Sequence, residues 1–238
     1  MAKGVITGDR NAFFTNIRNK IKTPPGGRAQ RVENPMEGLF TRRETTLEER
    51  QVLRDRFIGE WNNLGGEAFN VKNRVELAQK MKQVMLERGL KKAMCWDHPE
   101  LNKLNLEEVF TDAGGTLLKW PLGENSSDVK YKAGTMEAGI VWGDMAMAES
   151  GTVVITGNAK QPTTVAILPL TFMVVFTTAQ LVDGMYSVMK EFKKRYGTSL
   201  PTTATFISGP SRTTDIEMDL TIGVHGPRYV YAFILNEE

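Results

Sequence analysis

Cysteine and histidine are scarce in this chain of 238 residues, which has one cysteine, Cys95, and two histidines, His98 and His225. A single cysteine cannot form a disulfide within the chain, and it is typical of proteins from reducing compartments. Iron–sulfur clusters are usually held by four thiolates, and zinc sites built from nitrogen and sulfur also need several ligands. The sequence therefore predicts neither an iron–sulfur cluster nor a zinc site of this type, and we expect this chain to bind no cofactor and no metal of its own.

Long apolar runs and a marked excess of charge of one sign are also missing. The net charge is +2, and no run approaches the roughly 20 apolar residues that span a bilayer. The first seven residues lack the apolar core of a signal peptide. Binding to nucleic acid needs basic residues clustered on one face, which the sequence does not show. We therefore expect a cytoplasmic protein with no membrane span and no nucleic-acid partner.

Two common nucleotide-binding signatures are absent as well. The chain contains neither G-x-x-x-x-G-K-[ST] nor G-x-G-x-x-G, and no Ser–His–Asp set is visible by spacing. What the chain does have is an ordinary globular composition, with 41% hydrophobic and 24% charged residues. That length and composition predict one large domain with an appendage.

The appendage is expected at the N-terminus. Phe13, Ile17 and Ile21 recur at helical spacing, so residues 9–21 are predicted to form a short amphipathic helix. Proline and glycine then interrupt regular structure between Thr23 and Gly38. We predict that residues 1–45 form an N-terminal helix and a Pro/Gly-rich arm, and that residues 46–238 form the main domain.

Strand and helix patterns alternate along this main domain. One helix is predicted to begin at the capping box Thr46–Glu49, another at Asn73, and a short one at Asn105. Other expectations are one or two helical turns at 142–148, an extended run at 163–168, and a long helix from Leu181 to Gly197. Apolar strands that alternate with helices predict an α/β sheet with helices on both faces.

The most informative segment of the sequence is rich in Gly, Pro, Ser, Thr and charged residues. It runs through residues 207–217 and continues to residues 223–227, between two β-rich runs at 202–207 and 229–235. In open α/β sheets, ligands bind where strands end. The sequence therefore predicts a ligand site here.

Within this segment, the turn Gly209-Pro210-Ser211-Arg212 can serve binding or structure. In the first interpretation, backbone N–H groups and hydroxyls cradle an anion, and Arg212 clamps a carboxylate or phosphate. In the second, Thr214 to Glu217 is a capping box that begins a helix, and Arg212 pairs with Asp215 or Glu217. Both interpretations stay open.

Two further features of the segment have alternative readings. The acidic residues Asp215, Glu217 and Asp219 can together bind magnesium, although solvated or paired acids are more common. His225 is a candidate acid–base group, or it bonds a backbone carbonyl in a Gly-rich turn. His98 is interpreted as loop structure.

A second polar cluster spans Glu149 to Thr152, before a glycine turn that leads into a strand. Glu149 is a candidate nucleophile or base, or it accepts backbone N–H bonds and holds the turn. The candidate ligand-binding residues of both clusters are Glu149, Ser150, Gly151, Thr152, Gly209, Pro210, Ser211, Arg212, Thr213, Asp215, Glu217 and His225.

Together these clusters resemble the LUD domain family, in its lactate utilization protein C group. Residues 208–217 with 223–227 resemble the C-terminal signature of the family, and residues 146–152 resemble its A-x-A-E-T-G-T segment, with Ser150 in place of Thr. Residues 168–172 resemble its L-P-P-x-H-I segment, but Leu170 and Phe172 replace the second proline and the histidine. The similarity extends over about residues 60–238.

The resemblance implies a Rossmann-like three-layer α/β/α domain of the sugar-isomerase and CoA-transferase type. It also implies a non-redox subunit that works in the oxidation of L-lactate to pyruvate with partner subunits that carry iron–sulfur clusters. On this basis we expect a small anionic ligand at the two clusters. An alternative is an independent acyl-transfer enzyme like the CoA-transferases, with Glu149 as its nucleophile.

Overall fold

The computed structural model describes residues 9–22, 46–120, 131–197, 199–214 and 221–236. The chain divides into two units, Met1–Glu44 and Thr45–Glu238. In the first unit, helix α1 (Arg10–Lys22) confirms the predicted N-terminal helix. The carboxylate of Asp9 accepts a hydrogen bond of 2.8 Å from the backbone N–H of Asn11, as expected of a capping residue.

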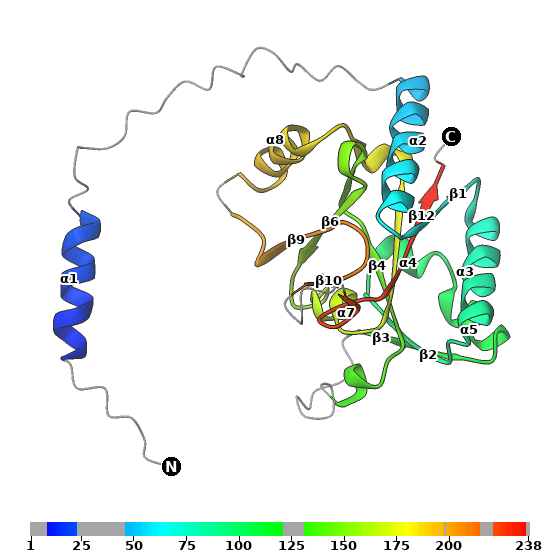
Figure 1. Ribbon diagram of the computed structural model, residues 1–238, viewed down its shortest axis with the longest axis horizontal. Coiled ribbons are helices and arrows are strands. Elements are labelled where there is room, and N and C mark those ends of the chain that lie inside the picture. The colour runs from blue at the N-terminus through cyan, green and yellow to red at the C-terminus, as the bar shows by residue number, and fades with distance from the viewer. Residues whose placement is uncertain (1–8, 23–45, 121–130, 198, 215–220, 237–238) are drawn as a thin grey trace. The chain divides into compact units, whose positions relative to one another are not determined.

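A six-stranded parallel sheet forms the centre of the second unit (Figure 1). Its strand order is β1-β12-β7-β4-β2-β3. The bounds are β1 (Glu67–Val71), β2 (Lys92–Cys95), β3 (Thr116–Lys119), β4 (Ala138–Trp142), β7 (Thr171–Thr177) and β12 (Tyr229–Leu235). Every residue of β4 and β7 is buried, as in parallel sheets that are covered on both faces. The predicted α/β class is confirmed.

A second, mixed sheet has four strands in the order β8-β5-β6-β9. These are β5 (Met145–Met147), β6 (Thr152–Gly157), β8 (Leu181–Val182) and β9 (Thr203–Ile207). A small hairpin of β10 (Arg212–Thr213) and β11 (Thr221–Ile222) follows β9. Helix α8 (Met185–Tyr196) packs beside β5.

Three helices of this unit begin directly after their predicted caps. Helices α2 (Leu47–Asn63) and α3 (Arg74–Arg88) start after Thr46 and Asn73, whose side chains accept hydrogen bonds from the backbone as predicted. Helix α5 (Leu106–Asp112) starts after Asn105 as predicted, but Asn105 has a left-handed backbone and its side chain makes no capping bond. The remaining helical segments are α4 (Pro99–Asn102), α7 (Thr164–Ile167), η1 (Ala148–Ser150) and η2 (Thr178–Gln180).

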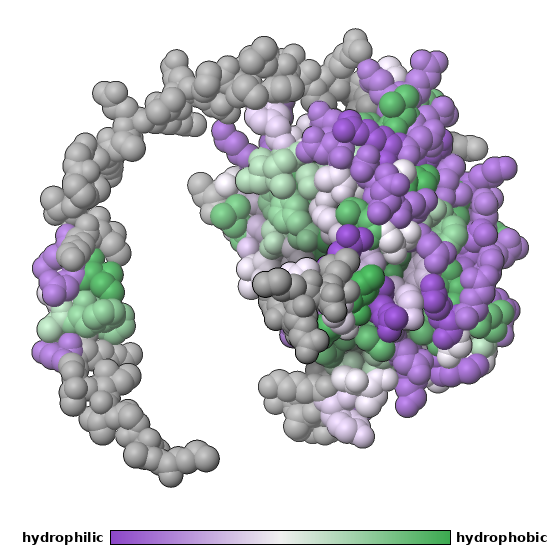
Figure 2. All heavy atoms as spheres, in the orientation of Figure 1, coloured by the Kyte–Doolittle hydropathy of each residue, from purple (hydrophilic) through white to green (hydrophobic). Residues whose placement is uncertain are grey.

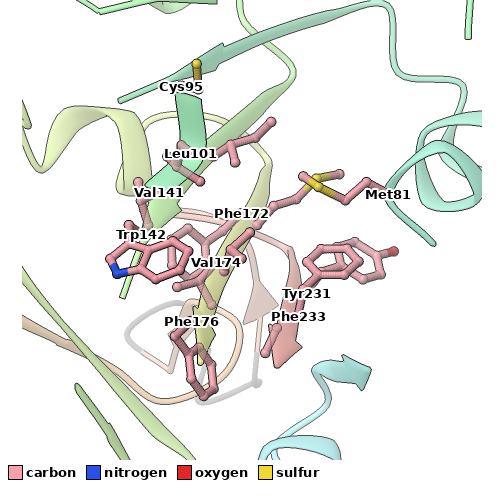
Figure 3. Close-up of a cluster of buried hydrophobic side chains, with 14 of the residues drawn as sticks. Met81, Cys95, Leu101, Val141, Trp142, Phe172, Val174, Phe176, Tyr231 and Phe233 are labelled. Atoms are coloured by element: carbon pink, nitrogen blue, oxygen red, sulfur yellow. The ribbon is translucent and has the colours of Figure 1, made fainter. Parts of the chain in front are cut away.

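Helices α3 and α5 lie on one side of the parallel sheet, and the mixed sheet with α8 lies on the other (Figure 1). The core between these layers is aromatic and aliphatic, and Met81 reaches from α3 toward Phe172 (Figure 3). Phe57 of α2 meets Phe176 of β7 edge to face, with ring centroids 5.2 Å apart. The outer surface over α2 and α3 is mostly hydrophilic (Figure 2). Burial of the apolar faces thus stabilises the stack of layers.

Three local predictions differ from the structure. The predicted helical turns at 142–148 are the end of β4, the strand β5 and the 3₁₀ turn η1. The predicted extended run at 163–168 contains the helical turn α7, and the predicted helix at Leu181 begins later, after the short strand β8. Short apolar runs have no periodicity that separates helix from strand, so tertiary packing decides them.

Candidate functional site

Pairing of β6 with β9 brings the two predicted polar clusters together. Val153 pairs with Ile207, so Thr152 lies beside Ser208 at one end of the mixed sheet. The hydroxyl of Thr152 is 2.7 Å from that of Ser150 and 2.6 Å from that of Ser208. Thr152 is only 2% exposed, so this chain of hydroxyls links the two clusters inside the protein.

Both glycine turns pack against the C-terminal end of α2. Gly151 has φ +54°, and a Cβ there would lie 2.5 Å from the backbone nitrogen of Trp61. Gly209 has φ +76°, and a Cβ there would lie 2.8 Å from the Cβ of Leu64. These glycines allow the turns to approach the helix closely.

Glu149 lies at the N-terminus of α8. Its backbone N–H donates to the carbonyl of Asp183 at 2.9 Å, and its Oε1 accepts the N–H of Met185 at 3.0 Å. The cap residue of this helix, Gly184, has no side chain, and a Cβ there would lie 2.4 Å from the carboxyl carbon of Glu149. Glu149 therefore caps the helix from a neighbouring turn, as in the second interpretation of this residue.

Arg212 also bonds the backbone. Its guanidinium donates to the carbonyl oxygen of Leu64, at the C-terminal end of α2. Arginine at this end of a helix satisfies a carbonyl that has no partner within the helix. Asp215 and Glu217, its alternative partners, lie outside the described residues, as do the predicted capping box and the acidic triplet that includes Asp219.

His225 is exposed in the loop that follows β11. Around it, Ser211 N–H donates to the carbonyl of Pro227 at 2.8 Å, and Arg228 N–H donates to the carbonyl of Leu170 at 2.8 Å. Leu170 stands just before β7, so this loop lies at the amino ends of the parallel strands. The expectation that the segment follows a strand of the open sheet is wrong, because β9 belongs to the mixed sheet.

The carboxyl ends of the parallel strands hold a different polar group. From β2 the chain moves outward to β3, then returns to the other side of β2 for β4 and continues through β7 to β12. Adjacent strands β2 and β4 thus flank the switch point of the topology, where open α/β sheets bind ligands. His98 stands three residues beyond β2, and Asp144 stands two residues beyond β4.

His98 is held in one orientation by two contacts. Its ring stacks on Trp142, with centroids 5.4 Å apart and planes 11° apart. Its Nδ1 accepts the N–H of Glu100 at 3.2 Å, so it caps α4 from the loop that precedes this helix. Burial lowers the pKa of His98, although nearby Asp144 acts in the other direction.

Asp144 is half-buried, and one of its carboxylate oxygens is fully engaged. Oδ2 accepts the backbone N–H of Thr156 at 2.7 Å and the hydroxyl of Thr156 at 2.9 Å. The hydroxyl of Tyr196 in turn donates to that of Thr156 at 3.2 Å. Burial raises the pKa of Asp144 despite these bonds.

Asp144 was not among the residues predicted from the sequence, and His98 was assigned only to loop structure. A usable signal exists for both, because each polar residue stands just after a buried apolar strand. The pairing of β2 with β4, which puts the two strand ends side by side, is a long-range property that no local pattern shows.

A pocket of about 490 Å³ lies at the same edge of the sheet. It is lined by residues from the ends of β2 and β3 and from α4 and α5, among them Cys95, Asn102 and Lys119. Burial raises the pKa of the Cys95 thiol to about 12, so it stays protonated and is a poor nucleophile at neutral pH.

Within the described part of the chain, no three acidic, histidine or cysteine side chains gather closely enough to hold a metal ion. None of its helices is both long and apolar enough to cross a membrane.

With this geometry established, comparison with known proteins decides the family. The model of the LUD domain matches residues 54–235. The chain belongs to the LUD domain family. The match covers the parallel sheet, the mixed sheet and the C-terminal part of α2, so both polar groups described above lie within the family domain.

Relatives of this chain carry a common name. It is 31% identical over 165 residues to lactate utilization protein C 1 of Bacillus mycoides, covering 68% of this chain and 70% of that protein. It is 30% identical over 159 residues to lactate utilization protein C of a Geobacillus species, covering 64% and 66%.

A solved structure shows the same fold. The crystal structure of a DUF162 family protein from Deinococcus radiodurans superposes with a TM-score of 0.56 at 15% identity. The alignment covers 78% of this chain and 98% of that one. At this identity the likeness concerns the arrangement of layers alone.

Proposed function

We propose that this chain works in lactate utilization, as a subunit of a system that oxidises L-lactate to pyruvate and carries no redox cofactor of its own. The observation that carries the proposal is the LUD domain match over residues 54–235, together with relatives named lactate utilization protein C. The proposed partners are subunits with iron–sulfur clusters, and the proposed compartment is the cytoplasm.

The single thiol of this chain supports the proposal that partner subunits carry the iron–sulfur clusters. Oxidation of lactate to pyruvate releases two electrons and two protons, so some subunit must accept electrons. Cys95 is the sole cysteine of the sequence, is 2% exposed and has a raised pKa. A cluster usually needs four thiolates, so electron transfer through clusters falls to other chains.

Genetics and co-purification test this proposal. Deleting the gene in the source organism should abolish growth on L-lactate as sole carbon source and leave growth on pyruvate intact. A tagged chain should co-purify with iron-containing proteins that reduce an electron acceptor when lactate is added. Normal growth of the deletion strain on lactate, or oxidation of lactate by the purified chain alone, would contradict the proposal.

A second candidate function is acyl transfer from a coenzyme A thioester, favoured by the exposure of Glu149. In that reaction a Glu149 carboxylate oxygen attacks the thioester carbonyl, the C–S bond breaks, and coenzyme A leaves as the thiolate. The product is an anhydride on Glu149, which hydroxylamine converts to a hydroxamate detectable by mass spectrometry. Absence of that adduct with a panel of acyl-CoAs would remove this candidate.

A further inference from the structure

The carboxyl ends of β2 and β4 offer hydrogen-bonding atoms that the described part of the protein leaves unused. Oδ1 of Asp144 accepts no hydrogen bond from any described residue, whereas Oδ2 accepts two. At His98, Nδ1 is occupied by the N–H of Glu100, and no described residue bonds Nε2. Neither atom is buried without a partner, because among the described residues only Trp61 Nε1 meets that condition, so both open atoms are accessible from solvent. Accessible open atoms at a topological switch point lie where open α/β sheets bind ligands.

The hydrogen bond at Nδ1 determines what His98 offers. Because Nδ1 accepts a hydrogen bond from a backbone N–H, the neutral ring must carry its own proton on Nε2. Burial favours that neutral form. Stacking on Trp142 holds the ring in place, so Nε2–H is a donor of fixed direction.

The two bonds from Thr156 fix Asp144 in the same way. With Oδ2 tied to a backbone N–H and a hydroxyl, the carboxylate plane cannot rotate freely, and Oδ1 stays an open acceptor. The positive charge of Arg195 and the neighbouring His98 both act to lower the pKa of Asp144, against the effect of burial. The site thus presents one donor and one acceptor from two adjacent strand ends.

The geometry points to a binding site for a small hydroxy acid at the ends of β2 and β4. The Nε2–H of His98 donates to the ligand carboxylate, and Oδ1 of Asp144 accepts from the ligand hydroxyl. A hydroxy acid carries an acceptor and a donor on neighbouring carbons, which is the complement of this pair. The site rests on the strand ends and their open atoms, whereas the choice of L-lactate as first probe rests on the proposed function.

Nuclear magnetic resonance of the two histidine rings tests the site directly. His225→Gln removes one imidazole signal and so assigns the other to His98. Titrating the full chain with L-lactate near neutral pH should move the His98 signals to saturation and leave those of His225 in place. Propionate lacks the hydroxyl and should bind at least about tenfold more weakly than L-lactate, because the bond to Asp144 is lost. Inorganic phosphate keeps a hydroxyl but has no carboxylate on a neighbouring carbon, so it should also bind more weakly than L-lactate.

Asp144→Asn is the decisive variant, because it keeps an oxygen for Thr156 and turns the open acceptor into a donor. We expect it to weaken L-lactate binding by about tenfold or more. Asp112→Asn makes the same change of charge at an exposed residue of α5 paired with Lys82, and should bind as the wild type does. Urea unfolding curves of both variants show whether they remain folded.

Each outcome decides the inference. Equal responses to lactate, propionate and phosphate would overturn the hydroxy-acid assignment, and so would unchanged affinity in folded Asp144→Asn. If Asp144→Asn does not fold, the comparison of the three ligands on the wild-type chain decides alone. If no hydroxy acid moves the His98 signals while the deletion strain fails to grow on lactate, the site is wrong and the proposed function stands. If L-lactate binds at the site but the deletion strain grows normally on lactate, the site is right and the proposed function is wrong.

Discussion

Two clusters of polar residues in this domain differ in how many hydrogen-bonding atoms their side chains leave without a partner. At the end of α2, Glu149 bonds the start of α8, Arg212 bonds a carbonyl of α2, and the hydroxyls of Thr152 and its neighbours bond one another. At the ends of β2 and β4, His98 and Asp144 each have one atom engaged and one atom open among the described residues.

The difference shows that a high density of polar residues in a sequence has two origins. Turns that must pack closely on a helix need glycine, and they need side chains that satisfy the helix ends. Ligand sites need groups whose capacity exceeds what the fold uses. The group at the end of α2 is therefore expected to act mainly on stability, and the strand-end group mainly on binding.

The largest effect that tests this contrast is expected at Gly151. In Gly151→Ala the new Cβ meets the backbone of Trp61 at 2.5 Å, and alanine must adopt φ +54°. We expect the free energy of unfolding to fall by about 2–4 kcal/mol, combining about 1 for the left-handed backbone with about 1–3 for overpacking. Urea denaturation measures it.

Gly59→Ala is the matched control in α2, where nothing lies within 4 Å of the new Cβ. Because alanine favours the helix, it should raise the free energy of unfolding by about 0.5–1 kcal/mol. Equal stability of the two variants would show that the turn at Gly151 does not depend on its close packing against α2.

A smaller loss is expected when Arg212 is removed. Arg212→Ala leaves the Leu64 carbonyl without its described partner, which should cost about 1 kcal/mol of unfolding free energy. Arg56→Ala, at an exposed position of α2 without a described hydrogen bond, should change it by less than about 0.5 kcal/mol. If Arg212→Ala unfolds like the wild type but abolishes lactate-dependent activity of the assembled system, the anion-clamp interpretation replaces the structural one.

The parts of the fold that depend on local sequence could be predicted. Thr46 and Asn73 mark the starts of helices through bonds to residues three positions away, and both were identified. The α/β class followed from alternating patterns over the whole domain. Short segments such as β5 and α7 could not be predicted, because the layers around them decide their conformation.

The candidate site shows the same limit. The cluster of polar residues at 207–217 was visible in the sequence, but its place at the amino ends of the parallel strands was not. That place depends on β9 joining the mixed sheet and on the loop returning to Leu170. Asp144 and His98 are 46 positions apart and come together only through the pairing of β2 with β4.

A modest change is expected at Glu149. Glu149→Gln keeps an oxygen for the N–H of Met185 and removes the negative charge at the N-terminus of α8, which should cost about 0.5 kcal/mol. Thermal unfolding at low and high salt measures it, since salt should reduce the difference. Loss of all activity with unchanged stability would instead favour the acyl-transfer candidate, whose nucleophile is this carboxylate.

The smallest expected effect is a pH dependence from the strand-end group. Because the pKa of His98 is lowered in the folded state, the unfolded chain binds its proton first as pH falls below about 6.5. The stabilisation present above that value is therefore lost as pH falls toward the folded pKa. Asp97, Glu100 and Asp144 oppose the lowering, and Lys103 adds to it.

Asp144 contributes to the pH dependence of stability with the opposite sign and at more acidic pH. Its folded pKa is raised, so the folded state binds the proton more tightly, and stability falls as pH rises above about 3.8 toward the raised value. Comparing His98→Gln with its parent in an Asp144→Asn background removes this contribution. As pH is lowered from about 7 to about 5, the urea midpoint of the parent should fall more steeply than that of the His98 variant. Parallel curves would mean that His98 has the same pKa in the folded protein as in the unfolded chain. That outcome conflicts with a ring that is held between Trp142 and the N–H of Glu100.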